Sequence, residues 1–318
     1  MPREKEIIGA KKQSRLAKGL KYGARLVFWS LALVLFLGYA SAIEAQDDKT
    51  FLWRVSDSSG PRLYLLGSVH LAQENMYPLK PVIEETFNKS DALLVEVDLE
   101  KVDLKTLNLD LFKVATYPGN ETIWDHLDAQ TAELLRDRLK DLKLSDVMFN
   151  KLRPWLVALT LGLLQLNVLG YQDQLGLDVH FIKQASAKGL GVFELESASE
   201  QFDALVSFSE SEGMLFLKST LLEFDEIGTE TAAIFKCWKE GDAAGFEDLF
   251  FKTLRENPDL APVFRLLIDE RNKTMFTRLK PYMEKFKAPF VVIGASHLVG
   301  KTGLIAAFKA AGYEVNQL

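Results

Sequence analysis

The amino-acid sequence predicts an α/β fold, with a mostly parallel sheet, flanking helices and a helical insertion. Short apolar runs that suit buried strands alternate with longer segments in which apolar residues recur three and four positions apart. The strand candidates are apolar almost throughout, as is typical of parallel sheets covered on both faces. With 318 residues, of which 48% are hydrophobic and 26% charged, the chain can bury a sizeable core.

Five segments are predicted to be strands. The first and weakest, residues 51–55, can pair with the second as a hairpin across the turn residues 57–60. The four stronger candidates are residues 62–66, 92–97, 190–195 and 290–293.

Helical patterns fill the intervals between these strands. Residues 78–87 start with a proline, and residues 128–139 place apolar side chains at helical spacing among charges. Residues 154–164 are apolar all round but too short to span a bilayer, which predicts a core helix. The interval between the second and third strong strands is too long for a simple crossover. We therefore expect a helical insertion packed on the sheet, at about residues 101–188, within one domain that covers residues 46–318.

The first 45 residues differ from the rest of the chain. Lysines and arginines from Arg3 to Arg25 precede an uncharged stretch over residues 26–43, and Ala40-Ser-Ala42 offers a cleavage site between small residues. This pattern predicts an export signal in residues 1–45, either a cleaved signal peptide or an N-terminal membrane anchor. In both cases we expect the domain to lie in the periplasm or on the outer face of the inner membrane.

Charge and cysteine content restrict the function. The net charge is −6, and because the N-terminal segment is basic, the remainder is more acidic still. Nucleic acid and anionic membrane surfaces are therefore not expected as partners of the domain. The single cysteine, Cys237, excludes an intramolecular disulfide and a cysteine-rich zinc site, and is predicted to be a buried structural thiol.

Two of the four histidines end matching phrases after two predicted strands. Each phrase is an apolar run, a glycine, two further residues and a histidine, so that Gly67 leads to His70 and Gly294 to His297. The glycine fits a tight turn out of the strand. Open parallel sheets bind ligands beyond the carboxyl ends of their strands. We therefore expect these two histidines to belong to a functional site.

Glu96 is the third candidate for this site. It lies in an apolar run, which places a carboxylate at the end of a strand that is otherwise buried. Such a group is costly unless it is paired, protonated or bound to a cation. His70, Glu96 and His297 thus make a candidate divalent-metal site with open positions for water or substrate. The alternative is that each histidine caps its strand through a backbone carbonyl and Glu96 pairs with an arginine.

Two further residues are candidates for catalytic roles. Glu196 follows the third strong strand and could act at the same edge as a general base or a support, the alternative being a solvated loop. Arg271 lies in a predicted helix and could clamp an anionic substrate group or hold Glu96 ionised, the alternative being a solvated helical face. Asp178 heads a predicted helix and could be only its N-cap. The two remaining histidines are predicted to be structural, namely His126 and His180.

Several motifs occur together along residues 50–318. They are Leu65-Leu-Gly-Ser-Val-His70, Asp91-Ala-Leu-Leu-Val-Glu-Val-Asp98, Gly176-Leu-Asp-Val-His-Phe181, Asp269-Glu-Arg-Asn272 and Val292-Ile-Gly-Ala-Ser-His297. In this order they resemble the TraB/PrgY/GumN family, whose animal relatives include the Tiki proteases. The chain departs from the family pattern at Glu194, where a small residue is usual, and this extra carboxylate near Glu196 could either alter the metal preference or merely face solvent.

The resemblance implies an EreA/ChaN-like α/β fold and metal-dependent peptide hydrolysis like that of the Tiki relatives. It assigns His70, Glu96 and His297 to a divalent metal, which could be Mn, Co or Zn, and Glu196 and Arg271 to supporting catalytic roles. The expected function is that of an exported metal-dependent hydrolase, a peptidase, with a peptide or small-molecule substrate. One alternative is a non-catalytic iron-, haem- or peptide-binding protein of the cell envelope. Another is a structural or inhibitory partner of an envelope protein.

Overall fold

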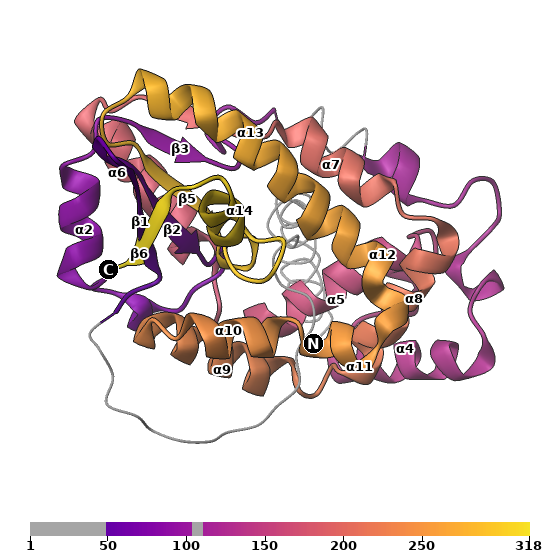
Figure 1. Ribbon diagram of the computed structural model, residues 1–318. Coiled ribbons are helices and arrows are strands. Elements are labelled where there is room, and N and C mark those ends of the chain that lie inside the picture. Colours follow the sequence, from indigo (N-terminus) through magenta and orange to yellow (C-terminus); the bar gives the residue numbers. More distant parts are fainter. Residues whose placement is uncertain (1–48, 104–110) are drawn as a thin grey trace.

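The computed structural model describes residues 49–103 and 111–318 (Figure 1). The signal peptide or anchor predicted at residues 1–45 lies outside the described residues, as does part of the predicted insertion. Within the two described ranges, no helix is both long enough and apolar enough to cross a membrane.

A sheet with strand order β4-β3-β5-β2-β1-β6 occupies one side of the molecule. Strands β4, β3, β5 and β2 are parallel, and β1 runs antiparallel to both β2 and β6. The prediction of an α/β fold with a mostly parallel sheet is confirmed. The strands span Leu52–Asp57 (β1), Gly60–Ser68 (β2), Leu93–Val95 (β3), Val192–Glu194 (β4), Phe290–Gly294 (β5) and Glu314–Gln317 (β6).

The register of the sheet aligns the two glycine phrases. β2 pairs with β5 so that Gly67 lies opposite Ile293, and Ser68 lies opposite Gly294. On the other side of β5, Val292 lies opposite Val95 of β3. Because these strands are parallel, the chain leaves all three at the same edge of the sheet.

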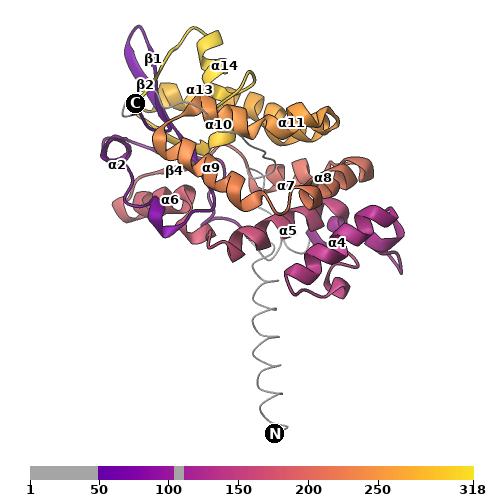
Figure 2. The ribbon, with the colours of Figure 1, turned by 90° about the horizontal axis from the view of Figure 1, so that it is seen from below.

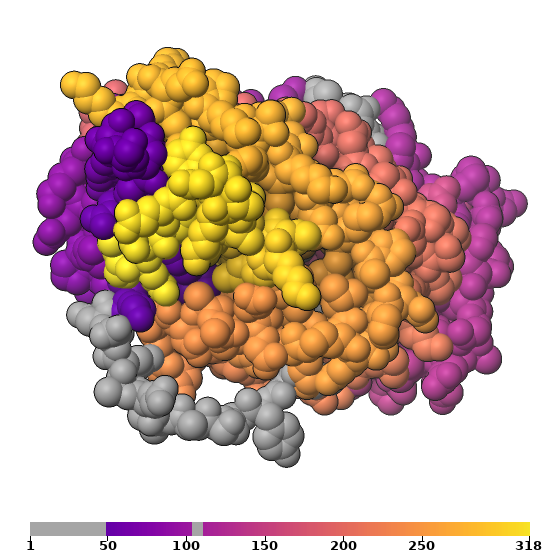
Figure 3. All heavy atoms as spheres, viewed as in Figure 1, coloured from indigo at the N-terminus to yellow at the C-terminus, as the bar shows by residue number. Residues whose placement is uncertain are grey.

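The antiparallel end of the sheet joins the two ends of the described chain. β1 and β2 form the predicted hairpin, and Gly60 in its turn has a φ of +115°, which suits glycine. β6 pairs with β1 on its free side. Figure 3 shows the C-terminal segment packed between this hairpin and the helices of the second half of the chain.

Helices α2, α4, α5 and α6 lie in the first two intervals between parallel strands. α4 begins after Asp128, whose side chain accepts a hydrogen bond from the N–H of Thr131, and α5 begins with Pro154. α6 packs against β3, β4 and β5 as the crossover that leads into β4. The bounds are Pro81–Asn88 (α2), Ala129–Asp141 (α4), Pro154–Val168 (α5) and Leu177–Lys188 (α6).

The helical insertion packs differently from the prediction. Among the insertion helices that the structure describes, only α6 packs closely against the strands, whereas α4 and α5 pack mainly against α8, which follows β4 in the sequence. α5 is apolar on all sides, so a layer of helices buries it better than one face of a sheet could. Figure 2 shows α4, α5 and α8 side by side, away from the strands.

The chain between β4 and β5 is helical, as predicted, and one more helix lies between β5 and β6. α12 and α13 are joined by a π-helical turn over Arg265–Asp269, directly before Arg271. The bounds are Ala198–Val206 (α7), Glu210–Leu222 (α8), Ile227–Glu240 (α9), Ala243–Phe250 (α10), Lys252–Glu256 (α11), Ala261–Phe264 (α12), Glu270–Lys285 (α13) and Leu304–Ala310 (α14).

Candidate active site

All five side chains predicted for the site meet beyond the carboxyl ends of the parallel strands. His70 follows β2, Glu96 follows β3 directly, and Glu196 lies just past β4, where its N–H donates to the carbonyl of Glu96 at 2.8 Å. His297 ends a short 3-10 helix after β5, and Arg271 comes from α13. None of these residues is more than 7% exposed. Burial excludes the solvated loop for Glu196 and the solvated helical face for Arg271.

Gly294 marks the point at which the three predicted metal ligands meet. A Cβ atom at Gly294 would lie 3.1 Å from Oε1 of Glu96, 3.2 Å from Nε2 of His70 and 3.4 Å from Cδ2 of His297. The three side chains therefore surround one small space. Their separation is well below the roughly 10 Å that would exclude a shared ion, whose ligand bonds are ~2 Å each.

A buried carboxylate orients His70. Nδ1 of His70 lies 2.7 Å from Oδ2 of Asp178, which also accepts a hydrogen bond from Oγ of Ser68. Asp178 is in the first turn of α6, but Gly176 is the N-cap, so the suggestion that Asp178 only caps the helix is wrong. Because the carboxylate accepts the Nδ1 hydrogen, the lone pair of a neutral His70 is on Nε2 and faces the space beside Gly294.

An amide orients His297 in the same way. Nδ1 of His297 lies 2.7 Å from Oδ1 of Asn272, whose Nδ2 donates to the carbonyl of Thr302 at 2.9 Å. The amide oxygen can only accept, so Nδ1 carries the hydrogen and Nε2 carries the lone pair. Nε2 is buried and has no hydrogen-bond partner among the described residues. A buried polar atom without a partner is costly, and a ligand at Nε2 would remove this cost.

The guanidinium of Arg271 joins the two carboxylates of the site. Its Nη2 donates to Oε2 of Glu96 at 2.7 Å and to Oε2 of Glu196 at 2.6 Å, and its Nε donates to both oxygens of Glu196. Nη1 donates to the carbonyl of Leu267. Because all three nitrogens bond within the protein, the geometry favours the role of holding Glu96 ionised over that of clamping a substrate anion.

The surroundings of each group set its protonation state. Burial would raise the pKa of Glu96, but the charge of Arg271, together with that of His70 and the hydrogen bond from the N–H of Gly294, outweighs it and lowers this pKa to about 2. Burial and Arg271 lower the pKa of His297 to about 3, so its ring is neutral. Burial also opposes the charged form of His70, but Asp178 and Glu96 raise its pKa to about 9. Glu96 and His297 are therefore in the forms that bind cations, whereas His70 must release a proton to do so.

Three polar residues of the site were not predicted to belong to it, namely Asp178, Asn272 and Gln201. Nε2 of Gln201 donates to Glu96 at 3.0 Å and to Glu196 at 3.2 Å. The sequence does hold a signal for Asp178, which lies at helical spacing from the apolar residues Phe181 and Ile182 and is buried with them. A polar residue on the apolar stripe of a helix is therefore a candidate site residue, as Glu96 is in its apolar strand.

The other two histidines lie outside this cluster. Nε2 of His180 is 2.8 Å from Glu84, and Nε2 of His126 is 2.7 Å from Glu121, in partly exposed pairs. The extra carboxylate of Glu194 accepts a hydrogen bond from the N–H of Asp98 at 2.8 Å.

The donor set suits a divalent cation in kind, although its atoms are not gathered around one point. Among the described residues, no group of three or more His, Cys, Asp or Glu side chains is arranged as a metal site. Oε1 of Glu96 instead accepts the N–H of Gly294 at 2.6 Å. The buried Nε2 of His297, which has no partner among the described residues, is the atom of the cluster that a bound cation would satisfy, and the nitrogen and oxygen donors are of the types that divalent cations bind.

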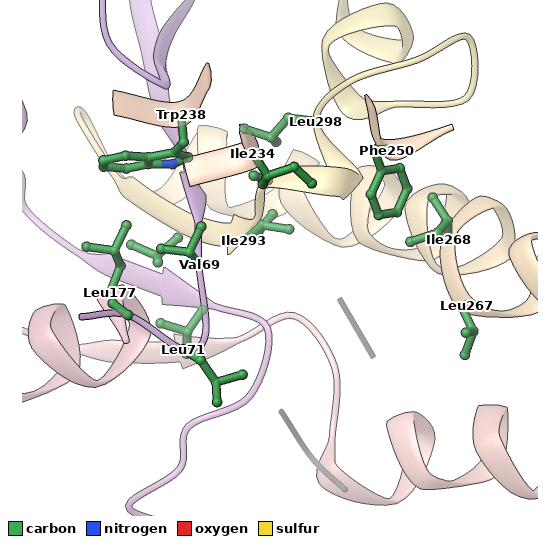
Figure 4. Packing of buried hydrophobic residues seen from close by; sticks show 14 of the residues in the cluster. Val69, Leu71, Leu177, Ile234, Trp238, Phe250, Leu267, Ile268, Ile293 and Leu298 are labelled. Carbon is green, nitrogen blue, oxygen red and sulfur yellow. The ribbon is translucent and has the colours of Figure 1, made fainter. Parts of the chain in front are cut away.

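A small cavity, here called the α9 cavity, is lined in part by His70. Its volume is about 30 Å³, and α9, α10 and the segments that follow β2 and β5 enclose it. Figure 4 shows Ile234 and Trp238 of α9 above Val69 and Ile293 at the strand ends. Nε1 of Trp238 donates to the carbonyl of Gly67 at 2.6 Å, which ties α9 to β2 beside the cavity.

Fold and site together define an α/β protein with a buried cluster of histidine, glutamate and arginine at the ends of its parallel strands. The model of the TraB/PrgY/gumN family matches residues 51–317, and the chain belongs to this family. It is similar to the uncharacterized protein YbaP of Escherichia coli (strain K12), with 22% identity over 257 residues, or 80% of this chain and 91% of that protein. YbaP of Shigella flexneri matches to the same extent. No solved structure matches the chain.

Proposed function

We propose that this chain is an exported metal-dependent hydrolase that acts on peptides. The observation that carries the proposal is the pair of oriented histidines beside Gly294. Each has Nδ1 hydrogen-bonded to a side-chain oxygen, and Nε2 of His297 is buried without a partner among the described residues. Histidines that bind metals usually donate their second ring N–H to such an oxygen.

His70, Glu96 and His297 would hold the cation, and their nitrogen and oxygen donors are compatible with Mn²⁺, Co²⁺ and Zn²⁺. When bound, the cation would supply Lewis-acid polarisation of a substrate carbonyl and activation of water. Arg271 keeps Glu96 anionic through the 2.7 Å hydrogen bond from Nη2. Asp178 and Asn272 fix the two imidazole rings.

Glu196 contributes to this arrangement through Arg271. Both of its oxygens accept hydrogen bonds from the guanidinium, and Gln201 donates to one of them. A general base needs an oxygen that can approach the proton it removes. In this arrangement Glu196 is a positioning residue, which fixes the guanidinium against Glu96.

Export and the peptide substrate rest on different support. The basic and apolar N-terminal sequence supports export. Membership of the TraB/PrgY/gumN family supports peptide hydrolysis through the resemblance to the Tiki proteases.

Metal titration tests the proposal. The purified full chain is stripped with a chelator and titrated with Mn²⁺, Co²⁺ or Zn²⁺ in a calorimeter, and each loaded form is incubated with a mixture of peptides. We expect one ion per chain and peptide cleavage, both abolished by His70→Ala and by His297→Ala. The matched controls His180→Ala and His126→Ala remove histidines outside the cluster and should leave both unchanged.

Two results would contradict the proposal in different ways. If no metal ion binds stoichiometrically in a way that depends on His70 and His297, the proposed metal dependence is contradicted. Metal binding without cleavage of any peptide would favour the non-catalytic binding protein.

A further inference from the structure

The α9 cavity has a polar floor and apolar walls. His70 and Ser296 line it on the side of the sheet, whereas Ile234, Phe246 and Phe250 line it on the side of α9 and α10. His70 also faces the space beside Gly294, and Ser296 directly precedes His297. A group bound in the α9 cavity would therefore lie next to the atoms that carry the proposed chemistry.

The hydroxyl of Ser296 is evidence that the α9 cavity binds a ligand. Ser296 is only 2% exposed, and its Oγ is buried without a hydrogen-bond partner in the described part of the chain. Most buried hydroxyls are hydrogen-bonded to protein or water. An oxygen of a bound molecule would give this hydroxyl its acceptor.

Packing fixes the size of the cavity. The ring of Phe246 contacts that of Phe51, with centroids 4.8 Å apart, and stacks on Phe250 at 6.3 Å. Trp238 holds α9 to the carbonyl of Gly67. A volume of about 30 Å³ accommodates about two water molecules, since one water needs ~10–15 Å³. A group of two or three heavy atoms therefore fits, and a branched or aromatic side chain does not.

We propose that the α9 cavity is a substrate subsite that accepts a small uncharged side chain, that of alanine or serine, from the residue beside the scissile bond. Ser296 donates a hydrogen bond to an oxygen of that residue. Ile234 is the residue that limits the size of the side chain. This subsite rests on the proposed peptidase function and adds the class of substrate to it.

A peptide series tests the selectivity. Internally quenched peptides that differ at one position, with Gly, Ala, Val, Leu or Phe, are incubated with the metal-loaded full chain. We expect Ala to exceed Leu in kcat/KM by at least about 10- to 200-fold, the range for a single methylene in an apolar pocket, because the side chain of Leu has three more carbon atoms than that of Ala. Ile234→Ala should raise the ratio of Leu to Ala at least tenfold. Ile83→Ala, the same truncation in the buried face of α2, should leave the ratio unchanged. A ratio that Ile234→Ala does not move would overturn the subsite.

Chemical labelling gives a result that does not depend on turnover. Thr231 also lines the cavity, so Thr231→Cys in a Cys237→Ala background places one thiol there. Methyl and benzyl methanethiosulfonate are compared by mass spectrometry. We expect the methyl reagent to react at least tenfold faster, and Ile234→Ala to narrow this difference. Equal rates, or no reaction with either reagent, would overturn the subsite. Size-dependent labelling in a protein that cleaves no peptide would support the small cavity and contradict the proposed peptidase.

Discussion

Two regions of the molecule bury glutamates and treat their charge in opposite ways. At the strand ends, Glu96 and Glu196 share the guanidinium of Arg271, and the pKa of Glu96 is lowered to about 2. In the first turn of α9, Glu230 is 6% exposed, and burial together with Glu223 and Glu226 raises its pKa to about 8. Burial likewise raises the pKa of Glu223 to about 7.

The difference lies in the compensating charge. Ionising a carboxylate inside a protein is costly unless a cation and hydrogen bonds stabilise it. Arg271 supplies both at the strand ends. At the start of α9, Lys252 only partly offsets the effect of burial, and Oε1 of Glu230 has no hydrogen-bond partner within the described residues. Glu96 is thus ionised where the proposed function needs an anion, whereas Glu230 is mostly protonated at neutral pH.

Removal of Arg271 should have the largest effect, because it would make the first region resemble the second. Arg271→Met leaves two buried carboxylates without their cation, and we expect a loss of about 3–5 kcal/mol in the free energy of unfolding at pH 7. Urea denaturation followed by circular dichroism measures it.

Arg278→Met is the matched control on the same helix. Arg278 pairs with Glu200 at a partly exposed site, where such pairs contribute about 0–1 kcal/mol. Equal losses for the two variants would mean that the buried cluster is no more dependent on its arginine than the surface is.

Glu96 was easier to predict from the sequence than the residues that support it. Glu96 was recognisable because strand residues on both sides of it are apolar. Arg271 lies four residues from Leu267 and from Met275, which places it on the buried stripe of its helix, yet with its charged neighbours Asp269 and Glu270 the sequence alone favoured a solvated helical face.

Tertiary packing decided what the sequence left open. The hydrogen bond from Asn272 to the carbonyl of Thr302 depends on how α13 lies against the loop after β5. The packing of α5 against α8 follows from the later helices, because an all-apolar helix carries no preferred face. The strand order also needed the structure, although the hairpin and the position of the site at the carboxyl edge did not.

A methyl group at Gly294 tests how closely the side chains at the strand ends pack around this glycine. Gly294→Ala places Cβ 3.1 Å from Oε1 of Glu96 and 3.2 Å from Nε2 of His70. Neither atom can withdraw easily, because the backbone N–H of Gly294 and the carboxylate of Asp178 hold these side chains. We expect a loss of about 1–3 kcal/mol in the free energy of unfolding, as for other overpacked sites.

Gly162→Ala in α5 is the control for a glycine with space around it, since no atom of another described segment lies within 4 Å of its added Cβ. It should stabilise the protein by about 0.5–1 kcal/mol through the helix propensity of alanine. A Gly294→Ala variant that gains stability as well would show that the three side chains leave more room than this geometry indicates.

The smallest expected effect tests the second region through its pH dependence. The ordinary pKa of Glu230 is 4.5, and its folded-state pKa is about 8. Between these values the unfolded chain has released its proton and the folded chain retains it, so this group makes stability fall as pH rises from 4.5 to 8. Glu230→Gln lacks the ionisation, and its stability relative to the natural chain should rise over this interval by about 1–2 kcal/mol. Glu85→Gln, at an exposed position of α2, should show no such trend. Unfolding curves at pH 4.5, 6 and 8 decide the matter: if Glu230→Gln and the natural chain keep a constant difference, Glu230 ionises normally and the contrast with Glu96 disappears.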